Sequence, residues 1–307
     1  MEKNKIDPIF VLQKDHLFGK IYCGDAIEFL ENQPENSCKL IIGSPPYFGK
    51  LDRYKGVDTG MSDWVEYMTR LTQRAVLVSS GYVIWIINGP VLNSCYNPVC
   101  ERLSTACFDA GIALDRPWIW YKNAANAPSG RARNCWELIQ VYRHKDKNVT
   151  LNLKSIGHPP KYKSGGKYKQ RGNKGQVIVG GNYPQNKICI PEDVLKTEEN
   201  IIDELYNILT DEQKEEFYKG QIMRIPVGGG MMGSKLSSEN EAAYPQNLIE
   251  PLIKVYTDID DTVCDPFSGS GTSGAAAFNL GRNFIANDLR MDQCELTNRR
   301  IKQQYNL

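Results

Sequence analysis

Short apolar runs alternate with longer segments of helical spacing along most of this 307-residue chain. Continuous apolar runs such as 82–87 are typical of strands buried on both faces of a parallel sheet. Helical spacing is clearest at 62–78. One face of this predicted helix carries Trp64, Tyr67, Met68, Leu71 and Ala75, and we expect it to pack into the core. The alternation predicts an α/β fold with strands at 20–23, 39–43, 82–87, 116–121, 137–142, 262–264 and 283–287. The predicted helices are 26–32, 62–78, 95–110 and 272–280, and residues 1–19 are predicted to be an arm.

The sequence Ser44-Pro45-Pro46-Tyr47 follows directly after the predicted strand 39–43. Two consecutive prolines remove two backbone donors and hold the preceding residues in extended conformations. The carbonyls of Ser44 and Pro45 therefore project with few competing donors, the Ser44 hydroxyl adds an acceptor, and Tyr47 adds a stacking face. Because ligands bind at the carboxyl ends of strands in open α/β sheets, this segment is a candidate binding cup. A Pro-Pro turn capped by an aromatic is the alternative.

A second motif, DPFSGSGT at 265–272, lies between a predicted strand and a predicted helix. Glycines allow a ligand to approach the backbone, and a helix N-terminus favours negative charge. The next strand ends at an acid, which can bind ribose hydroxyls. A G-x-G-x-x-G match at 269–274 also allows a dinucleotide site, but its position late in the chain and the DPF before it count against a nicotinamide cofactor. The candidate ligand contacts are Asp265, Phe267, Ser268, Gly269, Gly271, Thr272 and Asp288.

Together these motifs resemble those of the amino DNA methyltransferases that use S-adenosylmethionine. The Ser-Pro-Pro-Tyr motif comes first and the glycine motif last, an order similar to the beta group of that family. Ser-Pro-Pro-Tyr resembles the cytosine-N4 type, whereas Asp or Asn in the first position more often marks adenine-N6 enzymes. The resemblance implies a Rossmann-like methyltransferase fold with a seven-stranded, mostly parallel sheet and an inserted target-recognition region. It also implies double-stranded DNA as substrate, a restriction endonuclease as candidate partner, no metal, and action in the prokaryotic cytoplasm.

The resemblance gives roles to individual residues. In the family a Gly-Asp pair lies near the cofactor's adenine, which makes Asp25 a candidate acceptor; an N-cap of helix 26–32 is the alternative, and both roles can coexist. Asn247 lies in a Pro-led segment similar to one that borders the methionine end of the cofactor. The Ser44 hydroxyl and the Pro45 carbonyl are the candidates to grip the target amine, with Tyr47 stacked on a flipped base.

The middle of the chain differs from the rest in charge. The net charge is only +1, so a nucleic-acid surface must come from an uneven distribution. Residues 147–191 contain no acid and mix Lys, Tyr and Gly, which suits phosphate contact and base stacking; a solvated charged loop is the alternative. We predict a recognition region at 149–234, between a catalytic part at 1–148 and a cofactor part at 235–307. The candidate DNA contacts are Arg53, Arg131, Arg133, Lys161, Lys163, Lys167, Lys169 and Arg171.

Composition narrows the remaining alternatives. Nine cysteines without C-x-x-C spacing and only three histidines argue against a zinc site. No cysteine follows a proline, which argues against methylation of cytosine C5. The N-terminus does not have the pattern of a secretory signal, and the most apolar stretch, 75–87, is too short to span a bilayer. Adenine-N6 methylation, methylation of a glutamine amide, a non-catalytic DNA-binding module and an NAD enzyme are the alternatives.

Overall fold

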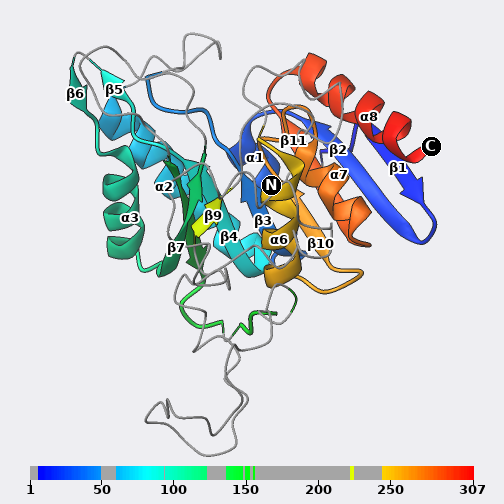
Figure 1. Cartoon of the computed structure of the whole chain (residues 1–307), viewed down its shortest axis with the longest axis horizontal. Helices are drawn as coiled ribbons and strands as arrows, with labels where there is room; N and C mark the ends of the chain where they lie inside the picture. Colours follow the sequence, from blue (N-terminus) through cyan, green and yellow to red (C-terminus); the bar gives the residue numbers. More distant parts are fainter. Residues whose placement is uncertain are drawn as a thin grey trace, which may run out of the picture.

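The computed structural model describes residues 6–49, 60–92, 94–122, 136–147, 149–152, 155, 222–224 and 244–307. These residues form a nine-stranded sheet with the order β1-β2-β11-β10-β3-β4-β8-β7-β9 (Figure 1). A separate two-stranded ladder joins β5 and β6. The strands of the large sheet are β1 Phe10–Lys14, β2 Leu17–Cys23, β3 Cys38–Gly43, β4 Ser79–Ile87, β7 Ala113–Tyr121, β8 Trp136–Arg143, β9 Ile222–Arg224, β10 Thr262–Asp265 and β11 Asn283–Asp288, and the small ones are β5 Val91–Leu92 and β6 Cys95–Tyr96.

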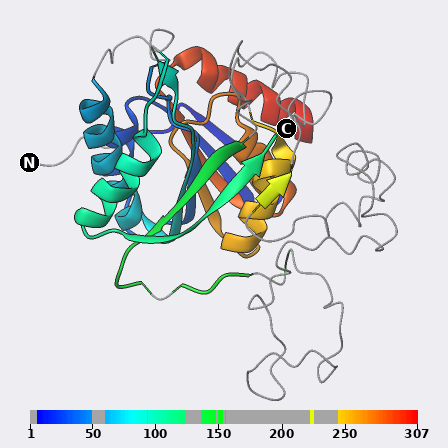
Figure 2. The ribbon, with the colours of Figure 1, turned by 60° about the vertical axis from the view of Figure 1, so that its left-hand side comes forward.

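Helices cover both faces of the large sheet. Helices α1, α2 and α3 contribute to one apolar cluster, and α6, α7 and α8 contribute to the other. Figure 2 shows the sheet between these two layers. The helices are α1 Ala26–Glu31, α2 Met61–Val78, α3 Val99–Asp109, α6 Gln246–Tyr256, α7 Thr272–Asn279 and α8 Met291–Tyr305. The predicted α/β architecture is therefore confirmed, with a sheet covered on both faces as in doubly wound folds.

The order in which the chain adds strands to the sheet changes side at its centre. Strands β2, β11, β10, β3 and β4 pair in parallel, whereas β8 runs antiparallel to both β4 and β7. The β10–α7–β11 unit extends to one side of β10, and the β3–α2–β4 unit extends to the other side of β3. The boundary between β10 and β3 is thus a topological switch point, where open α/β sheets place their ligands.

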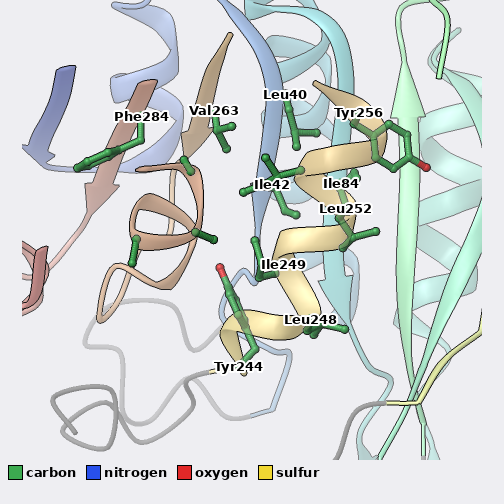
Figure 3. Packing of buried hydrophobic residues seen from close by; sticks show 14 of the residues in the cluster. Leu40, Ile42, Ile84, Tyr244, Leu248, Ile249, Leu252, Tyr256, Val263 and Phe284 are labelled. Carbon is green, nitrogen blue, oxygen red and sulfur yellow. The ribbon is translucent and has the colours of Figure 1, made fainter. Parts of the chain in front are cut away.

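Burial on both faces explains the continuous apolar runs in the central strands. Figure 3 shows α6 lying across β3 and β4, with apolar side chains filling the space between them. The fully buried residues at this contact include Leu40, Ile42, Ile84, Leu248, Ile249 and Leu252. On the opposite face, Trp64, Met68, Leu71 and Ala75 of α2 are buried, which confirms the predicted packing face.

The predicted strand count of seven is wrong, because two edge strands extend the sheet to nine. Strand β1 lies in the predicted arm and pairs with β2 through a tight turn at Asp15, whose φ is 53°. Of the apolar run 9–12, only Leu12 is buried, because β1 is an edge strand. Strand β9 is three residues long and pairs in parallel with β7, although it falls within the range predicted for the recognition region.

The predicted helix 95–110 begins later than expected. Cys95–Tyr96 instead forms β6, and α3 begins at Val99. Asn97 precedes Pro98, and a residue before proline is disfavoured in the helical region, so the helix starts only after the proline. Within the described residues, no helix combines the length and apolar character needed to cross a membrane.

Candidate active site

The two sequence motifs meet at the ends of β3 and β10. These strands pair in parallel, with Leu40 opposite Val263 and Ile41 opposite Cys264. Gly43 ends β3 directly before the Ser-Pro-Pro-Tyr motif, and a Cβ added to it would lie 2.7 Å from Oδ1 of Asp265. A side chain at this position would therefore displace the Asp265 carboxylate. The lack of a side chain at Gly43 lets the residue before Ser44 pack against Asp265, the first residue of the glycine motif.

Asp265 is buried at this junction and accepts hydrogen bonds from both sides. The Tyr244 hydroxyl donates to Oδ2 over 3.0 Å, and the backbone N–H of Phe267 donates to Oδ1 over 2.9 Å. The Tyr244 hydroxyl also lies 2.6 Å from the Ser273 hydroxyl. Burial raises the pKa of Asp265 to about 6, and these hydrogen bonds oppose the rise. The carboxyl group is therefore held in one orientation in a water-poor environment.

The glycine turn places backbone N–H groups at the start of α7. Gly269 and Gly271 have φ values of 50° and 76°, in the left-handed region that favours glycine. Gly271 caps α7, and a Cβ on it would lie 2.7 Å from Cγ2 of Thr297. The Thr297 hydroxyl donates to the Gly269 carbonyl over 2.9 Å. Helix α8 thus packs closely against the turn, and only glycine fits at 271.

Asp288, the acidic residue at the end of β11, stabilises this turn through hydrogen bonds. Its Oδ2 accepts from the Gly269 N–H over 2.9 Å, and its Oδ1 accepts from the Arg290 N–H over 3.0 Å. Burial raises its pKa. The side chain therefore joins the ends of β10 and β11, and its proposed contact with a ribose stays a prediction.

Two buried polar atoms at these strand ends lack protein partners. In the described part of the chain, neither Oγ of Ser268 nor Oδ1 of Asn287 has a hydrogen-bond partner. The Asn287 amide donates to the Gly24 carbonyl over 2.9 Å and to the Pro266 carbonyl over 3.3 Å, so it joins the ends of β2 and β10. Buried polar groups are nearly always satisfied, and a polar ligand at the strand ends would satisfy these two. The site therefore fits a polar cofactor beside the glycine turn.

Asp25 is the N-cap of α1, as the structural alternative predicted. Its Oδ1 accepts from the N–H groups of Ile27 and Glu28 over 2.9 and 3.1 Å. The Tyr67 hydroxyl donates to Oδ2 over 3.3 Å, and burial followed by the Asp25 charge raises the pKa of Tyr67. Asp25 lies at the end of β2, on the same edge of the sheet as Asp288. Its additional role as an acceptor for adenine stays a prediction.

The hydroxyl of Thr272 contacts a buried arginine that the sequence analysis missed. Arg300 of α8 is fully buried and donates to Oγ1 of Thr272 over 2.8 Å and to the Ser270 carbonyl over 3.1 Å. Burial lowers its pKa to about 10. The Arg300 side chain therefore packs against the glycine turn, and it also donates to Oε1 of Gln246 in α6 over 3.5 Å. Asn247, the predicted contact at the methionine end, lies in the first turn of α6 and is partly buried.

The Ser-Pro-Pro-Tyr cup is held at several points. Pro45 is buried, and the Trp64 indole donates to the Pro46 carbonyl over 2.9 Å. The Tyr47 hydroxyl donates to Oε2 of Glu137 over 2.7 Å, and burial raises the pKa of Tyr47. Ser44 is partly buried at the end of β3. The carbonyl that Trp64 engages is not the one predicted to grip the target amine.

Phe267 connects the cofactor motif to the opposite layer. Its ring packs edge-on against Trp85 of β4, with centroids 6.1 Å apart and an interplanar angle of 68°. Among the described residues, no cluster of three or more His, Cys, Asp or Glu side chains could hold a metal ion. The predicted DNA contacts Arg53, Arg131, Arg133, Lys161, Lys163, Lys167, Lys169 and Arg171 lie outside the described residues.

Comparison with known proteins identifies the family. A family model described as DNA methylase, N6_N4_Mtase, matches residues 38–299. Type II methyltransferase M.BglII from Bacillus subtilis is 23% identical over 286 residues, covering 92% of this chain and 68% of the relative. The solved structure of the cytosine-N4-specific PvuII DNA methyltransferase superposes with a TM-score of 0.64 at 16% identity, covering 98% of this chain and 94% of that chain.

A second solved structure contains the cofactor. It is a DNA modification methylase from Thermus thermophilus complexed with S-adenosyl-L-methionine, with a TM-score of 0.57 at 19% identity and 93% coverage of both chains. These likenesses confirm the methyltransferase fold, and the family model spans most of the chain. The protein therefore belongs to the N6/N4 DNA methylase family, whose members transfer a methyl group from S-adenosylmethionine to an amino group of a DNA base.

Proposed function

We propose that this DNA methyltransferase methylates the exocyclic N4 amine of cytosine, and that transfer takes place at the cup formed by residues 44–47. The observation that carries the proposal is the placement of Ser44-Pro45-Pro46-Tyr47 beside the glycine turn at the switch point between β3 and β10. The serine in the first position supports cytosine over adenine. A relative of similar fold is named as cytosine-N4-specific, which agrees with this choice.

The chemistry of the cup suits a poorly nucleophilic amine. The lone pair of an exocyclic base amine is delocalised into the ring, so two acceptors that bind its hydrogens favour the pyramidal nitrogen needed for attack. The Ser44 hydroxyl and the Pro45 carbonyl are these acceptors, held in place by the two prolines. S-adenosylmethionine supplies an electrophilic methyl group. The amine nitrogen forms the new N–C bond as the S–C bond breaks, and the surplus proton passes to water.

A base inside a duplex cannot reach these acceptors, so the target nucleotide must leave the stack. The ring of Tyr47 stacks on the flipped base and holds its amine at the acceptors. The Trp64–Pro46 hydrogen bond keeps the backbone of the cup still during this step. These contacts contribute orientation rather than covalent catalysis.

The cofactor lies across the ends of β2, β11 and β10 in this proposal. Gly269 and Gly271 allow close backbone approach, and Ser268 supplies an unpaired hydroxyl. Asp288 and Asp25 face the nucleoside end. Asp265, Phe267 and Thr272 flank the turn, and Asn247 borders the methionine end.

Residues 149–234 form the target-recognition region in this proposal, with the basic residues of 161–171 on the phosphates of double-stranded DNA. We infer further that the enzyme acts in the prokaryotic cytoplasm and is paired with a restriction endonuclease, since a relative is named a type II methyltransferase.

The product of the reaction tests the proposal. The purified protein is incubated with methyl-labelled S-adenosylmethionine and genomic DNA, and the DNA is then digested to nucleosides and separated. We expect the label in N4-methylcytosine. Label in N6-methyladenine would overturn the choice of base, and an absence of label in DNA would overturn the function.

A further inference from the structure

The ring of Tyr47 is anchored by a buried ion pair that no sequence motif marks. Its hydroxyl donates to Oε2 of Glu137 over 2.7 Å, and Lys122 pairs with the other carboxylate oxygen. Glu137 is the second residue of β8, after Trp136, and Lys122 directly follows β7. The side chains of Lys122 and Glu137 are only 19% and 9% exposed. The cup at the end of β3 is thereby tied to the ends of β7 and β8 in the same half of the sheet.

Stability alone is a weak reason for such a pair. Removing two charges from water costs free energy that their attraction often fails to recover, and apolar replacements of similar size are frequently neutral or stabilising. The pair does, however, supply a fixed acceptor. An ionised carboxylate only accepts hydrogen bonds, so Glu137 always faces the Tyr47 hydroxyl as an acceptor while Lys122 keeps its charge balanced.

Lys122 is itself held in place. Its Nζ lies 5.1 Å from the centroid of the Trp120 ring, in the geometry of a cation–π contact. Trp120 is buried and pairs with Glu137 across the β7–β8 ladder. The chain Trp120–Lys122–Glu137–Tyr47 therefore runs from the rigid sheet to the cup without an exposed link.

We propose that Glu137 and Lys122 are positioning residues, which fix the direction in which the Tyr47 ring projects and so its place against the target base. The inference rests on the proposed role of the cup. Two points then hold this residue: the neighbouring Pro46 carbonyl is bound by Trp64, and the far end of the ring is bound by Glu137. With both ends fixed, the ring already projects toward the position of the base before a base arrives, so less side-chain freedom is lost at binding.

Three variants separate orientation from charge and from stability. Tyr47→Phe keeps the stacking face and removes the hydroxyl. Lys122→Met/Glu137→Leu removes the ion pair and the acceptor together. The matched control, Lys122→Met/Glu137→Gln, removes the charges but leaves an amide oxygen that still accepts from Tyr47.

We expect Tyr47→Phe and Lys122→Met/Glu137→Leu each to lower kcat about tenfold, because small misplacement of the base costs turnover more than binding. DNA affinity should stay within about twofold, since the stacking face remains. The matched control should lose clearly less kcat than Lys122→Met/Glu137→Leu, because its amide oxygen still accepts from Tyr47. Adding Tyr47→Phe to Lys122→Met/Glu137→Leu should cause much less than a further tenfold loss, because both changes break the Tyr47–Glu137 hydrogen bond and only the contact of the Tyr47 hydroxyl with Ser44 is lost in addition. A fluorescent base analogue at the methylated position reports stacking without turnover. The change in its fluorescence on binding should be smaller for Tyr47→Phe and Lys122→Met/Glu137→Leu than for wild type and the matched control.

Additive losses, or equal losses in the two double variants, would overturn the inference. Wild-type kcat and analogue signal for Tyr47→Phe would overturn it even if a double variant fails to fold. Circular dichroism and the affinity for S-adenosylhomocysteine report folding independently of the cup. Failure of the proposed function has a different signature: the wild-type protein would then leave no label in N4-methylcytosine, whatever the coupling between Tyr47 and Glu137.

Discussion

Gly271 lies in the turn between the cofactor motif and α7. The free-energy cost of replacing it by alanine follows from its backbone conformation and its neighbours. A φ of 76° places a side chain in the left-handed region, at roughly 1–2 kcal/mol. A Cβ would also lie 2.7 Å from Cγ2 of Thr297, and overpacking of this kind costs roughly 1–3 kcal/mol. We therefore expect Gly271→Ala to lower the free energy of unfolding by about 2–5 kcal/mol.

Gly111 offers a matched control. Its φ is 80°, but nothing lies within 4 Å of the position that its Cβ would take. Gly111→Ala should therefore show the backbone cost alone. Thr297→Ser removes Cγ2 yet keeps the hydroxyl that donates to the Gly269 carbonyl, so it should recover part of the loss in the Gly271→Ala background.

Denaturant unfolding measures the stability of these variants, and calorimetric titration with S-adenosylhomocysteine measures the cofactor site. Gly271→Ala should weaken binding at least tenfold, because the N–H groups of the turn must shift, whereas Gly111→Ala should bind normally. The reasoning is refuted if Gly271→Ala is no less stable than Gly111→Ala, or if it binds the cofactor product with wild-type affinity.

Three further predictions concern separate parts of the site. The raised pKa of Asp265, about 6 against 3.8, means that its protonated form stabilises the fold; this contribution is complete below about pH 3.8 and is lost as the pH rises through 6. Wild type should therefore lose about 3 kcal/mol of unfolding free energy relative to Asp265→Asn across that window, and parallel pH curves in denaturant unfolding would contradict this. Asp25→Ser keeps an N-cap, so its stability should change by less than about 1 kcal/mol while calorimetry shows weaker cofactor binding; unchanged binding would leave Asp25 a cap only. Neutralising Lys163, Lys167 and Lys169 should flatten the salt dependence of DNA binding by roughly one log–log unit per lost phosphate contact, and an unchanged slope would mean that these residues do not touch DNA.

Much of the fold could be predicted from the sequence because the central strands are buried on both faces. The predicted strands correspond to β2, β3, β4, β7, β8, β10 and β11. Of these, β2, β3, β4, β10 and β11 end at or near a Gly, Pro or Asp. The edge strands could not be predicted in this way. Strand β1 lies on an apolar run at 9–12, but it is an edge strand with only Leu12 buried, so burial on both faces does not identify it. Strand β9 has three residues, and its pairing with β7 depends on tertiary contact.

The residues of the candidate site also fall into those that local patterns predict and those that depend on distant contacts. The glycines of the turn and the Ser-Pro-Pro-Tyr cup are local patterns, so spacing alone marks them. Arg300 and Glu137 are single charged residues in ordinary amphipathic elements, and their importance comes from burial beside distant segments. Tyr244 lies just before the Pro-led segment that contains Asn247, and no local pattern indicates that its hydroxyl binds Asp265. Such long-range polar contacts leave no periodic signal in one sequence.

The central claim is that methyl transfer takes place at the Ser44 cup, and the turnover of Ser44→Ala tests it most directly. The substitution removes one acceptor and leaves both prolines and the Tyr47 ring in place, so the loss should fall on the transition state. Single-turnover methylation should slow by about a hundredfold or more, by analogy with loss of one preorganised hydrogen-bonding group, while DNA and cofactor affinities stay at wild-type values. Ser62→Ala, at an exposed position in α2, should methylate at the wild-type rate. A wild-type rate for Ser44→Ala would contradict the account, because the cup would then not be where the base reacts.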